Sequence, residues 1–313
     1  MVPFVPARWL AVVAFGLVLI ALPMVFANKF QLSVLILVGL SAIVCVGLNL
    51  LVGTAGQISL GHAGFFGIGA YASAVLTGDF GWSGVAAIAA GMAASVVLGV
   101  GVGWPILRLR GHYLAMATLG VGVIVYLTLV REIGLTGGPD GRPVAALTLF
   151  GRRMQGEFAW YCIVAAVLWV CVWAAENLSS SPWGRSLRAI HGSEHAAAAL
   201  GIDVHRLKVA VFAASAALAS LAGSLYAHAF AFVTPDQAGF LHSVEFVVMI
   251  VVGGLGSVFG GVVGAAVIVV LPQVLTALKD YEHLVFGALL IAVVFVMHRG
   301  LAPTAVNLWR SRL

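Results

Sequence analysis

Apolar stretches long enough to cross a bilayer recur along the chain, and only short polar segments separate them. A membrane-spanning helix needs about 20 mostly apolar residues, and no polar segment here is large enough to fold separately. The pattern predicts an all-α protein, a polytopic transmembrane helical bundle that forms one domain over residues 1–313. The ten spans expected from apolar length cover residues 9–27, 31–52, 62–78, 82–107, 112–131, 158–176, 207–230, 239–253, 260–278 and 283–298.

Composition excludes an ordinary soluble domain. Of the 313 residues, 62% are hydrophobic and 9% are charged, whereas soluble domains hold about 25% charged residues. The net charge of +5 is modest, and the basic residues lie at the ends of apolar runs, so they indicate membrane topology rather than a nucleic-acid surface. Membrane lipid is therefore the expected surrounding, with no nucleic acid partner.

The three cysteines, Cys45, Cys162 and Cys171, lie inside apolar runs without CxxC spacing. That placement favours small core side chains over a disulfide framework. The sequence predicts neither a metal site nor a cofactor.

The basic residues also indicate an orientation. With both termini in the cytoplasm, ten of the 16 Lys and Arg residues fall on the inner side and six on the outer side, as the positive-inside rule requires. Four of the six outer charges share the loop at 131–157, so the side of that loop stays open. The inner set includes the strongly basic segment at 179–206, between spans six and seven.

Glycine gathers in two clusters, 53–69 and 253–264, one in each half of the chain. Gly-interrupted apolar segments at matching positions of two halves are typical of inverted repeats with broken or re-entrant helices around a central pathway. Spans two to five and seven to ten would then be the two repeats.

Glycines can also serve only for close helix packing, and isolated pairs such as Gly99/Gly103 and Gly260/Gly264 favour that interpretation. The cluster at 53–69 differs, because polar groups at membrane depth need a lining of protein or water. Its polar members include Gln57, Ser59 and His62.

Residues 47–74, GLNLLVGTAGQISLGHAGFFGIGAYASA, break an apolar helix and then resume it. Backbone amides freed at the start of the second half-helix would suit a passing carboxylate. For His62 two interpretations remain: a histidine hydrogen-bonded to a neighbouring helix, which we favour for a lone His, and a proton carrier or ligand.

This segment is similar to the signature of the LivM and LivH type permeases of branched-chain amino-acid ABC importers. The resemblance covers nearly the whole chain. The region 111–143 matches the family in its Thr-Gly-Gly-x-x-Gly turn, which is either a tight outer loop or a plain connection. Residues 243–266 match a second Gly-rich signature of the family, and residues 286–301 match its last span. The turn residues are Thr136, Gly137, Gly138 and Gly141. Gly261 stands where the family often has Pro.

The Ala-rich segment at 179–206 is helical by composition. It resembles the cytoplasmic coupling loop of ABC permeases, in which a short helix docks into a groove on the ATPase subunit; an inert connecting loop is the alternative. Ser193 departs from the family, where Asn is commoner. The matching positions are Gly184, Arg185, Arg188, Ala189, Ile190, Glu194, Ala196, Ala197, Gly201 and Ile202.

Enzymatic interpretations of the sequence are weak. His191, Glu194 and His195 spell a zinc-protease HxxEH pattern, but the segment offers no third ligand. Ser/His pairs for an intramembrane protease lack a third group. No GxxxxGK[ST] motif is present, so ATP would be hydrolysed by a separate subunit.

Glu245, in or near span eight, faces either the permease interior or the outer interface, where it would snorkel. The predicted substrate pathway combines the two Gly-rich segments with this acid. Its residues are Gly56, Gln57, Ser59, Gly61, His62, Gly64, Glu245, Gly253, Gly254, Gly256 and Ser257.

The resemblance implies a permease subunit of an ABC importer in the bacterial inner membrane, which moves branched-chain amino acids, or related amino acids, amides or urea, by ATP-driven alternating access. It implies cytoplasmic ATPase subunits, a second permease subunit, for which a paralogue is favoured, and a periplasmic substrate-binding protein. An ion-coupled secondary transporter is the alternative, and it would need more buried carboxylates than Glu245 alone.

Overall fold

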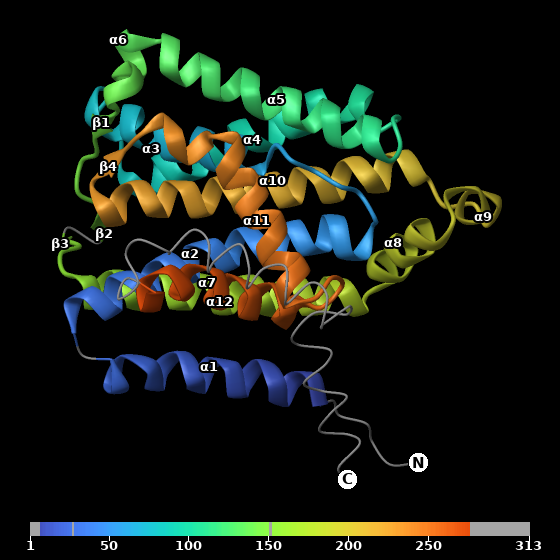
Figure 1. The fold of residues 1–313 in the computed structure, drawn as a ribbon, viewed down its shortest axis with the longest axis horizontal. Helices are drawn as coiled ribbons and strands as arrows, with labels where there is room; N and C mark the ends of the chain where they lie inside the picture. The colour runs from blue at the N-terminus through green and yellow to red at the C-terminus, as the bar shows by residue number, and fades with distance from the viewer. Residues whose placement is uncertain (1–6, 27, 150–151, 276–313) are drawn as a thin grey trace.

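The computed structural model describes residues 7–26, 28–149 and 152–275. Long helices lie side by side along one common direction (Figure 1), so the predicted all-α bundle is confirmed. The helices are α1 (Ala7–Val25), α2 (Lys29–Asn49), α3 (His62–Gly78), α4 (Gly84–Ile106), α5 (His112–Arg131), α6 (Ile133–Thr136), α7 (Glu157–Ser180), α8 (Pro182–Gly192), α9 (Glu194–Ala199), α10 (Val204–Phe230), α11 (Phe240–Gly253) and α12 (Val258–Leu275).

Short irregular elements connect the helices. A π-helical turn, Leu50–Thr54, continues α2, and 3-10 turns cover Gly138–Asp140 and Pro235–Ala238. Strand β1 (Arg142–Pro143) pairs with β4 (Phe232–Val233), and β2 (Thr148–Leu149) pairs with β3 (Arg152–Arg153), both antiparallel. In Figure 1 the strands lie at one end of the bundle, and α8 and α9 lie at the other, which we call the α8 end.

Nine of the ten expected spans coincide with helices, and the tenth, at 283–298, lies outside the described residues. Five helices are long and apolar enough to cross a membrane: α2 with its π-helical turn, α4, α5, α7 and α10. Helices α11 and α12 pass that test only as a pair, bent by 118° at the break between them. With 14 residues, α11 is only about 21 Å long, too short to cross the hydrocarbon core alone.

The packing agrees with the predicted inverted repeats. Helices α2 and α10 run in opposite directions (Figure 1). Helix α4 packs along α10 as α12 packs along α2, and α3 packs on α4 as α11 packs on α12. The partner of α5 in the second half would be the tenth expected span.

Two glycines let α3 and α10 cross at backbone contact. A Cβ on Gly69 would overlap the Ser220 carbonyl, and a Cβ on Gly223 would overlap the Phe66 carbonyl. The Ser224 hydroxyl donates to the Gly69 carbonyl (2.9 Å). Here the small residues serve close packing, as GxxxG-like contacts do in membranes.

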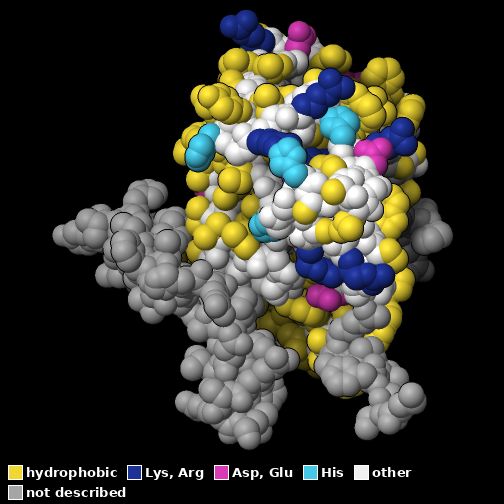
Figure 2. All heavy atoms as spheres, turned by 90° about the vertical axis from the view of Figure 1, so that its right-hand side faces the viewer, with side chains coloured by type: hydrophobic (Ala, Val, Ile, Leu, Met, Phe, Trp, Pro, Cys, Tyr) yellow, Lys and Arg dark blue, Asp and Glu magenta, His cyan; other side chains and the backbone are white. Residues whose placement is uncertain are grey.

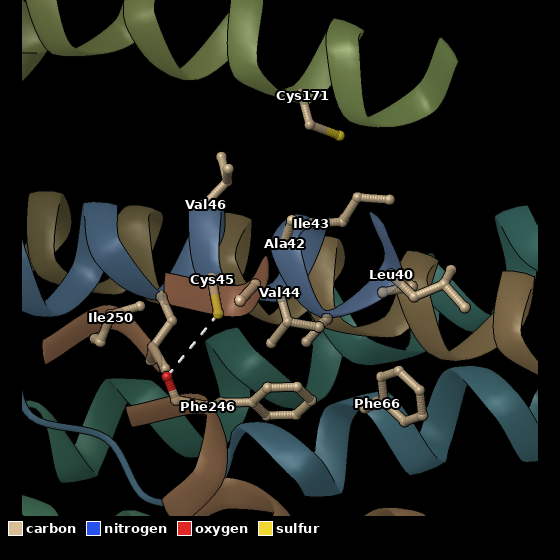
Figure 3. Packing of buried hydrophobic residues seen from close by; sticks show 14 of the residues in the cluster. Leu40, Ala42, Ile43, Val44, Cys45, Val46, Phe66, Cys171, Phe246 and Ile250 are labelled. Carbon is tan, nitrogen blue, oxygen red and sulfur yellow. Dashed lines mark hydrogen bonds between the residues drawn. The ribbon is translucent and has the colours of Figure 1, made fainter. Parts of the chain in front are cut away.

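Helix α2 occupies the centre of the hydrophobic core. Figure 3 shows its residues Leu40 to Val46 between Cys171 of α7 on one side and Phe66, Phe246 and Ile250 on the other. Cys45 and Cys171 are buried free thiols, as expected for small core residues, whereas Cys162 is exposed. The second half of this span, residues 42–49, is buried on all sides, which explains why it shows no polar face.

Candidate functional site

The first Gly-rich segment forms a broken helix. After the π-helical turn the chain runs without helix from 56 to 61 and resumes as α3 at His62. Gly56 has a φ of 71°, a value that L side chains rarely adopt, and a Cβ there would meet the ring of His191 in α8. The break therefore lies against α8.

Two glycines that the sequence assigns to the pathway pack against α5. A Cβ on Gly61 would overlap the Thr118 carbonyl, and a Cβ on Gly64 would lie 3.2 Å from the Cα of Gly122. The amide of Leu60 donates to the Thr118 hydroxyl (3.1 Å). These contacts fix the break on α5.

His62 joins the break to α10. Its side chain is fully buried, with Nδ1 2.9 Å from the Ser59 hydroxyl and Nε2 2.7 Å from the Ser215 hydroxyl. The rings of Phe65 and Phe212 lie edge-on to it. This is the geometry of the favoured interpretation, a histidine hydrogen-bonded to a neighbouring helix.

Two amides at the start of α3 are already hydrogen-bonded in this conformation. The Ala63 amide donates to the Ser243 hydroxyl of α11 (3.0 Å), and the Gly64 amide donates to the Gly61 carbonyl (3.1 Å). The amides of Ala63 and Gly64 are thus not free for a carboxylate in this conformation. Gln57 is different, because its side chain is buried yet neither of its polar atoms has a hydrogen-bond partner among the described residues.

The second Gly-rich segment turns between α11 and α12, and Asn49 of α2 holds that turn. The Asn49 amide donates to the carbonyls of Gly254 (3.2 Å) and Ser257 (2.7 Å), and its carbonyl accepts from the Gly256 amide (2.7 Å). Gly254 and Gly256 have φ values of 119° and 78°. The two breaks therefore meet, since Gly53 lies directly against Gly256.

Glycines flanking this turn let α11 and α12 touch. A Cβ on Gly253 would overlap the Gly260 carbonyl, and one on Gly264 would overlap the Met249 carbonyl. Gly253 is thus a packing residue, whereas Gly256 is exposed and Ser257 is partly exposed.

Glu245 does not face the interior of this chain. Its side chain is 52% exposed and lies 2.9 Å from Nδ1 of His242, one turn earlier on α11. Ring contacts with Phe66 and Phe246 hold His242. A carboxylate on the outer surface of a membrane helix is costly against lipid, so a polar partner or water is expected to cover this face.

The segment expected to be helical forms α8 and α9. Helix α8 turns Leu187 and Ile190 toward the bundle, and Arg185 and Arg188 donate to the carbonyls of Ser180 and Ser179 at the end of α7. Of the ten positions matched to a coupling loop, Gly184, Ile190 and Ala197 are buried, Ala189, Glu194 and Ile202 are partly exposed, and Arg185, Arg188, Ala196 and Gly201 are exposed.

Glu194 turns inward rather than outward. One carboxylate oxygen is 3.1 Å from Nε of Arg110, in the α4–α5 linker, and the other contacts the ammonium of Lys208 in α10. Arg110 also donates to Nε2 of His195 (3.2 Å). Two residues of the HxxEH pattern are therefore engaged with cations, and the third, His191, lies beside Gly56.

The α8 end is the basic end of the bundle. Figure 2 looks onto it and shows Lys, Arg and His side chains gathered on this face around a paler area, with few acidic side chains. Exposed apolar side chains accompany them, among them Trp183 (57% exposed) and Leu200 (79% exposed). This combination suits a protein partner.

The Thr-Gly-Gly-x-x-Gly motif makes a tight loop at the other end. The Thr136 hydroxyl donates to the Leu129 carbonyl (2.6 Å) and accepts from the Gly138 amide (3.2 Å). Arg142 donates to both carboxylate oxygens of Asp79, at 2.6 and 3.1 Å. This hydrogen bonding from Arg142 lowers the pKa of the Asp79 carboxyl below its usual value.

We expect Asp79→Asn to speed amide hydrogen exchange over residues 135–142 about two- to fivefold, the range that a partly exposed ion pair supplies. The lowered pKa of Asp79 means that this contribution is present at neutral pH and is lost as pH falls through that pKa. Asp140→Asn, at an exposed site of the same loop, is the control. Equal exchange in both variants would contradict the role of the pair.

Apolar helices, two breaks that meet inside the bundle and a basic helical pair at one end define a multi-pass α-helical membrane protein with broken helices. The family model described as "Branched-chain amino acid transport system / permease component" matches residues 30–294. The chain belongs to this family.

Similar proteins of known name carry the same family description. The chain is 31% identical over 263 residues to the high-affinity branched-chain amino acid transport system permease protein LivM of Salmonella typhimurium and 32% identical over 266 residues to LivM of Escherichia coli. Each alignment covers 76% of this chain and 62% of the relative, so the chain spans less than two thirds of their length. LivH of Escherichia coli is 27% identical over 75% of this chain and 82% of its own length. No solved structure matches the chain significantly.

Sequence reasoning missed several residues that organise this site, above all Asn49, Arg110, Lys208, Ser215 and Ser243. Each is a polar side chain in or beside an apolar segment, which is the signal that could have found them, because such groups need partners inside the protein.

Proposed function

We propose that this chain is a permease subunit of an ABC importer, which moves branched-chain amino acids across the bacterial inner membrane by alternating access. Family membership and the names of the LivM and LivH relatives support the substrate class. Other amino acids, amides and urea remain alternatives, because a binding protein outside the membrane would select the substrate.

The observation that carries this proposal is the position of α8 and α9. They form a compact, partly apolar pair on the basic end of the bundle, and Gly56 of the first break contacts His191 of α8. A short helix that docks into a groove of a partner can transmit rigid-body motion. Separate ATPase subunits at this end would hydrolyse ATP, and their motion would displace α8 and α9 and, through them, the two helix breaks.

Charge supports an orientation for the chain. The positive-inside rule favours the basic α8 end as the cytoplasmic end, so we propose that both termini are cytoplasmic and that the loop containing Arg142, which pairs with Asp79, is periplasmic. That outer loop would receive the substrate-binding protein.

The pathway would run past the meeting point of the two breaks. Gln57 is its best-supported contact, because a buried amide without partners is costly and could bind a polar group of the substrate. Glu245 and His242 would face a second permease subunit, a paralogue in the favoured arrangement. Within the described residues no carboxylate is buried, which favours the ATP-driven importer over an ion-coupled transporter.

The test is co-purification with the ATPase subunit after Leu200→Glu. Burying an unpaired carboxylate in an interface costs several kcal/mol, so ATPase recovery should fall about a hundredfold. Leu135→Glu, at an exposed apolar site on the opposite end (53% exposed), should leave recovery unchanged. Full ATPase recovery with Leu200→Glu would remove α9 as the docking site.

A further inference from the structure

Lys208 is a buried cation that the proposed function does not use. Its side chain is only 5% exposed, near the start of α10, and its ammonium contacts the Glu194 carboxylate. A buried charge is strongly destabilising without its partner. The pair therefore holds the start of α9 against α10.

Arg110 gives the same carboxylate a second connection. It lies in the α4–α5 linker, two residues before α5 begins, and its Nε is 3.1 Å from Glu194. The other arginines of the segment, Arg185 and Arg188, are bonded back to the end of α7. Glu194 is thus the residue of α9 that reaches both α10 and the start of α5.

Helices α10 and α5 also hold the first break. Helix α10 contacts it through the Ser215–His62 hydrogen bond (2.7 Å). Helix α5 contacts it through Thr118, whose hydroxyl accepts from the Leu60 amide (3.1 Å). Both connections from α9 therefore end on residues 59–62, by two separate helices.

We propose that Lys208 and Arg110 are positioning residues that carry the displacement of α9 along α10 and α5 to the first break. A displacement of α9 pulls both helices because one carboxylate holds both cations. The break then moves with α10 and α5 together, and Gln57 moves with it. This inference rests on the proposed function, since the partner ATPase supplies the displacement.

The experiment uses the assembled importer in lipid nanodiscs and proteoliposomes, with the ATPase, second permease and binding protein present. Two quantities are measured: ATP-induced change in hydrogen exchange over residues 55–64, and leucine taken up per ATP hydrolysed. We expect Lys208→Met to keep the ATPase bound and hydrolysing, yet to lower uptake per ATP about tenfold, within the range of typical coupling energies, and to abolish the exchange response.

Charge exchange separates transmission from simple folding. The double variant Glu194→Lys/Lys208→Glu restores this pair in reverse but sets a lysine against Arg110, so it should recover uptake per ATP only to about the level of Arg110→Gln. Arg110→Gln removes only the more exposed connection and should give a smaller loss. Arg206→Gln is the matched control, because its ion pair with Asp203 lies within one helix turn of α10, with side chains 78% and 53% exposed.

Each outcome of these measurements either supports or overturns the role of Lys208 and Arg110. Unchanged uptake per ATP and an unchanged exchange response in Lys208→Met would overturn the proposal, as would loss of the ATPase subunit from that variant. If Lys208→Met does not accumulate, Arg110→Gln and the double variant give the same decision. A wild-type importer that takes up no leucine would count against the proposed function alone, because the exchange response to ATP would still decide the role of Lys208. A wild-type chain that binds no ATPase would overturn both.

Discussion

Asn49→Leu is expected to abolish uptake and to lower the thermal unfolding midpoint of the chain by roughly 5 to 15 °C. The substitution leaves the carbonyls of Gly254 and Ser257 and the amide of Gly256 without their partner. Gly254 is buried, Ser257 is partly exposed and Gly256 is exposed, so losing the three hydrogen bonds would together cost about 2 to 4 kcal/mol. The turn between α11 and α12 would then detach from α2.

Two quantities are measured: the thermal unfolding midpoint in detergent, monitored by static light scattering, and leucine uptake by the assembled importer. Asn28→Leu is the control, since that asparagine caps the start of α2 at an exposed site and its loss should cost only about 1 kcal/mol. An unchanged midpoint in Asn49→Leu would show that the turn is held by packing alone.

Gly223→Leu is expected to prevent folding. The new side chain would meet the backbone of Phe66, and a backbone carbonyl cannot swing aside as a side chain can. Overpacking typically costs about 1 to 3 kcal/mol, and the cost should exceed that range here because α3 and α10 must separate along their length. We expect no monodisperse peak when a fluorescent fusion is run on a sizing column.

Gly101→Leu supplies the matched comparison. That glycine lies in the C-terminal part of α4, and nothing lies within 4 Å of a Cβ placed there. Its replacement should give a normal peak, since leucine also favours helix more than glycine does. Equal peaks from the two variants would mean that the protein still folds when α3 and α10 are forced apart at their crossing.

Apolar length was sufficient to predict where the helices lie. It predicted nine of the described helices to within a few residues, because a bilayer demands long apolar segments with satisfied backbones. It could not predict the 118° bend between α11 and α12, which depends on two glycines at positive φ and on Asn49, about 200 positions earlier.

The site was harder to predict, because a glycine beside a polar residue has the same sequence pattern whether it lines a pathway or packs on a helix. Gly61 and Gly64 were assigned to the pathway and lie against α5. Glu194 was assigned to the ATPase surface and faces Lys208 and Arg110, which are 14 and 84 positions away. Sequence spacing contains no information on such pairings between helices.

Asn49 of α2 and the α11–α12 turn that it holds are synthesised far apart in time. Asn49 is synthesised 207 residues before Gly256, so at 5 to 20 residues per second about 10 to 40 s pass before its partner exists. Through that interval the asparagine stands at the end of a mostly apolar helix with its amide still to be paired. The nascent first half thus enters the membrane before its central helix is fully packed, because α11 and α12, the final neighbours of that helix, are synthesised last among the described helices.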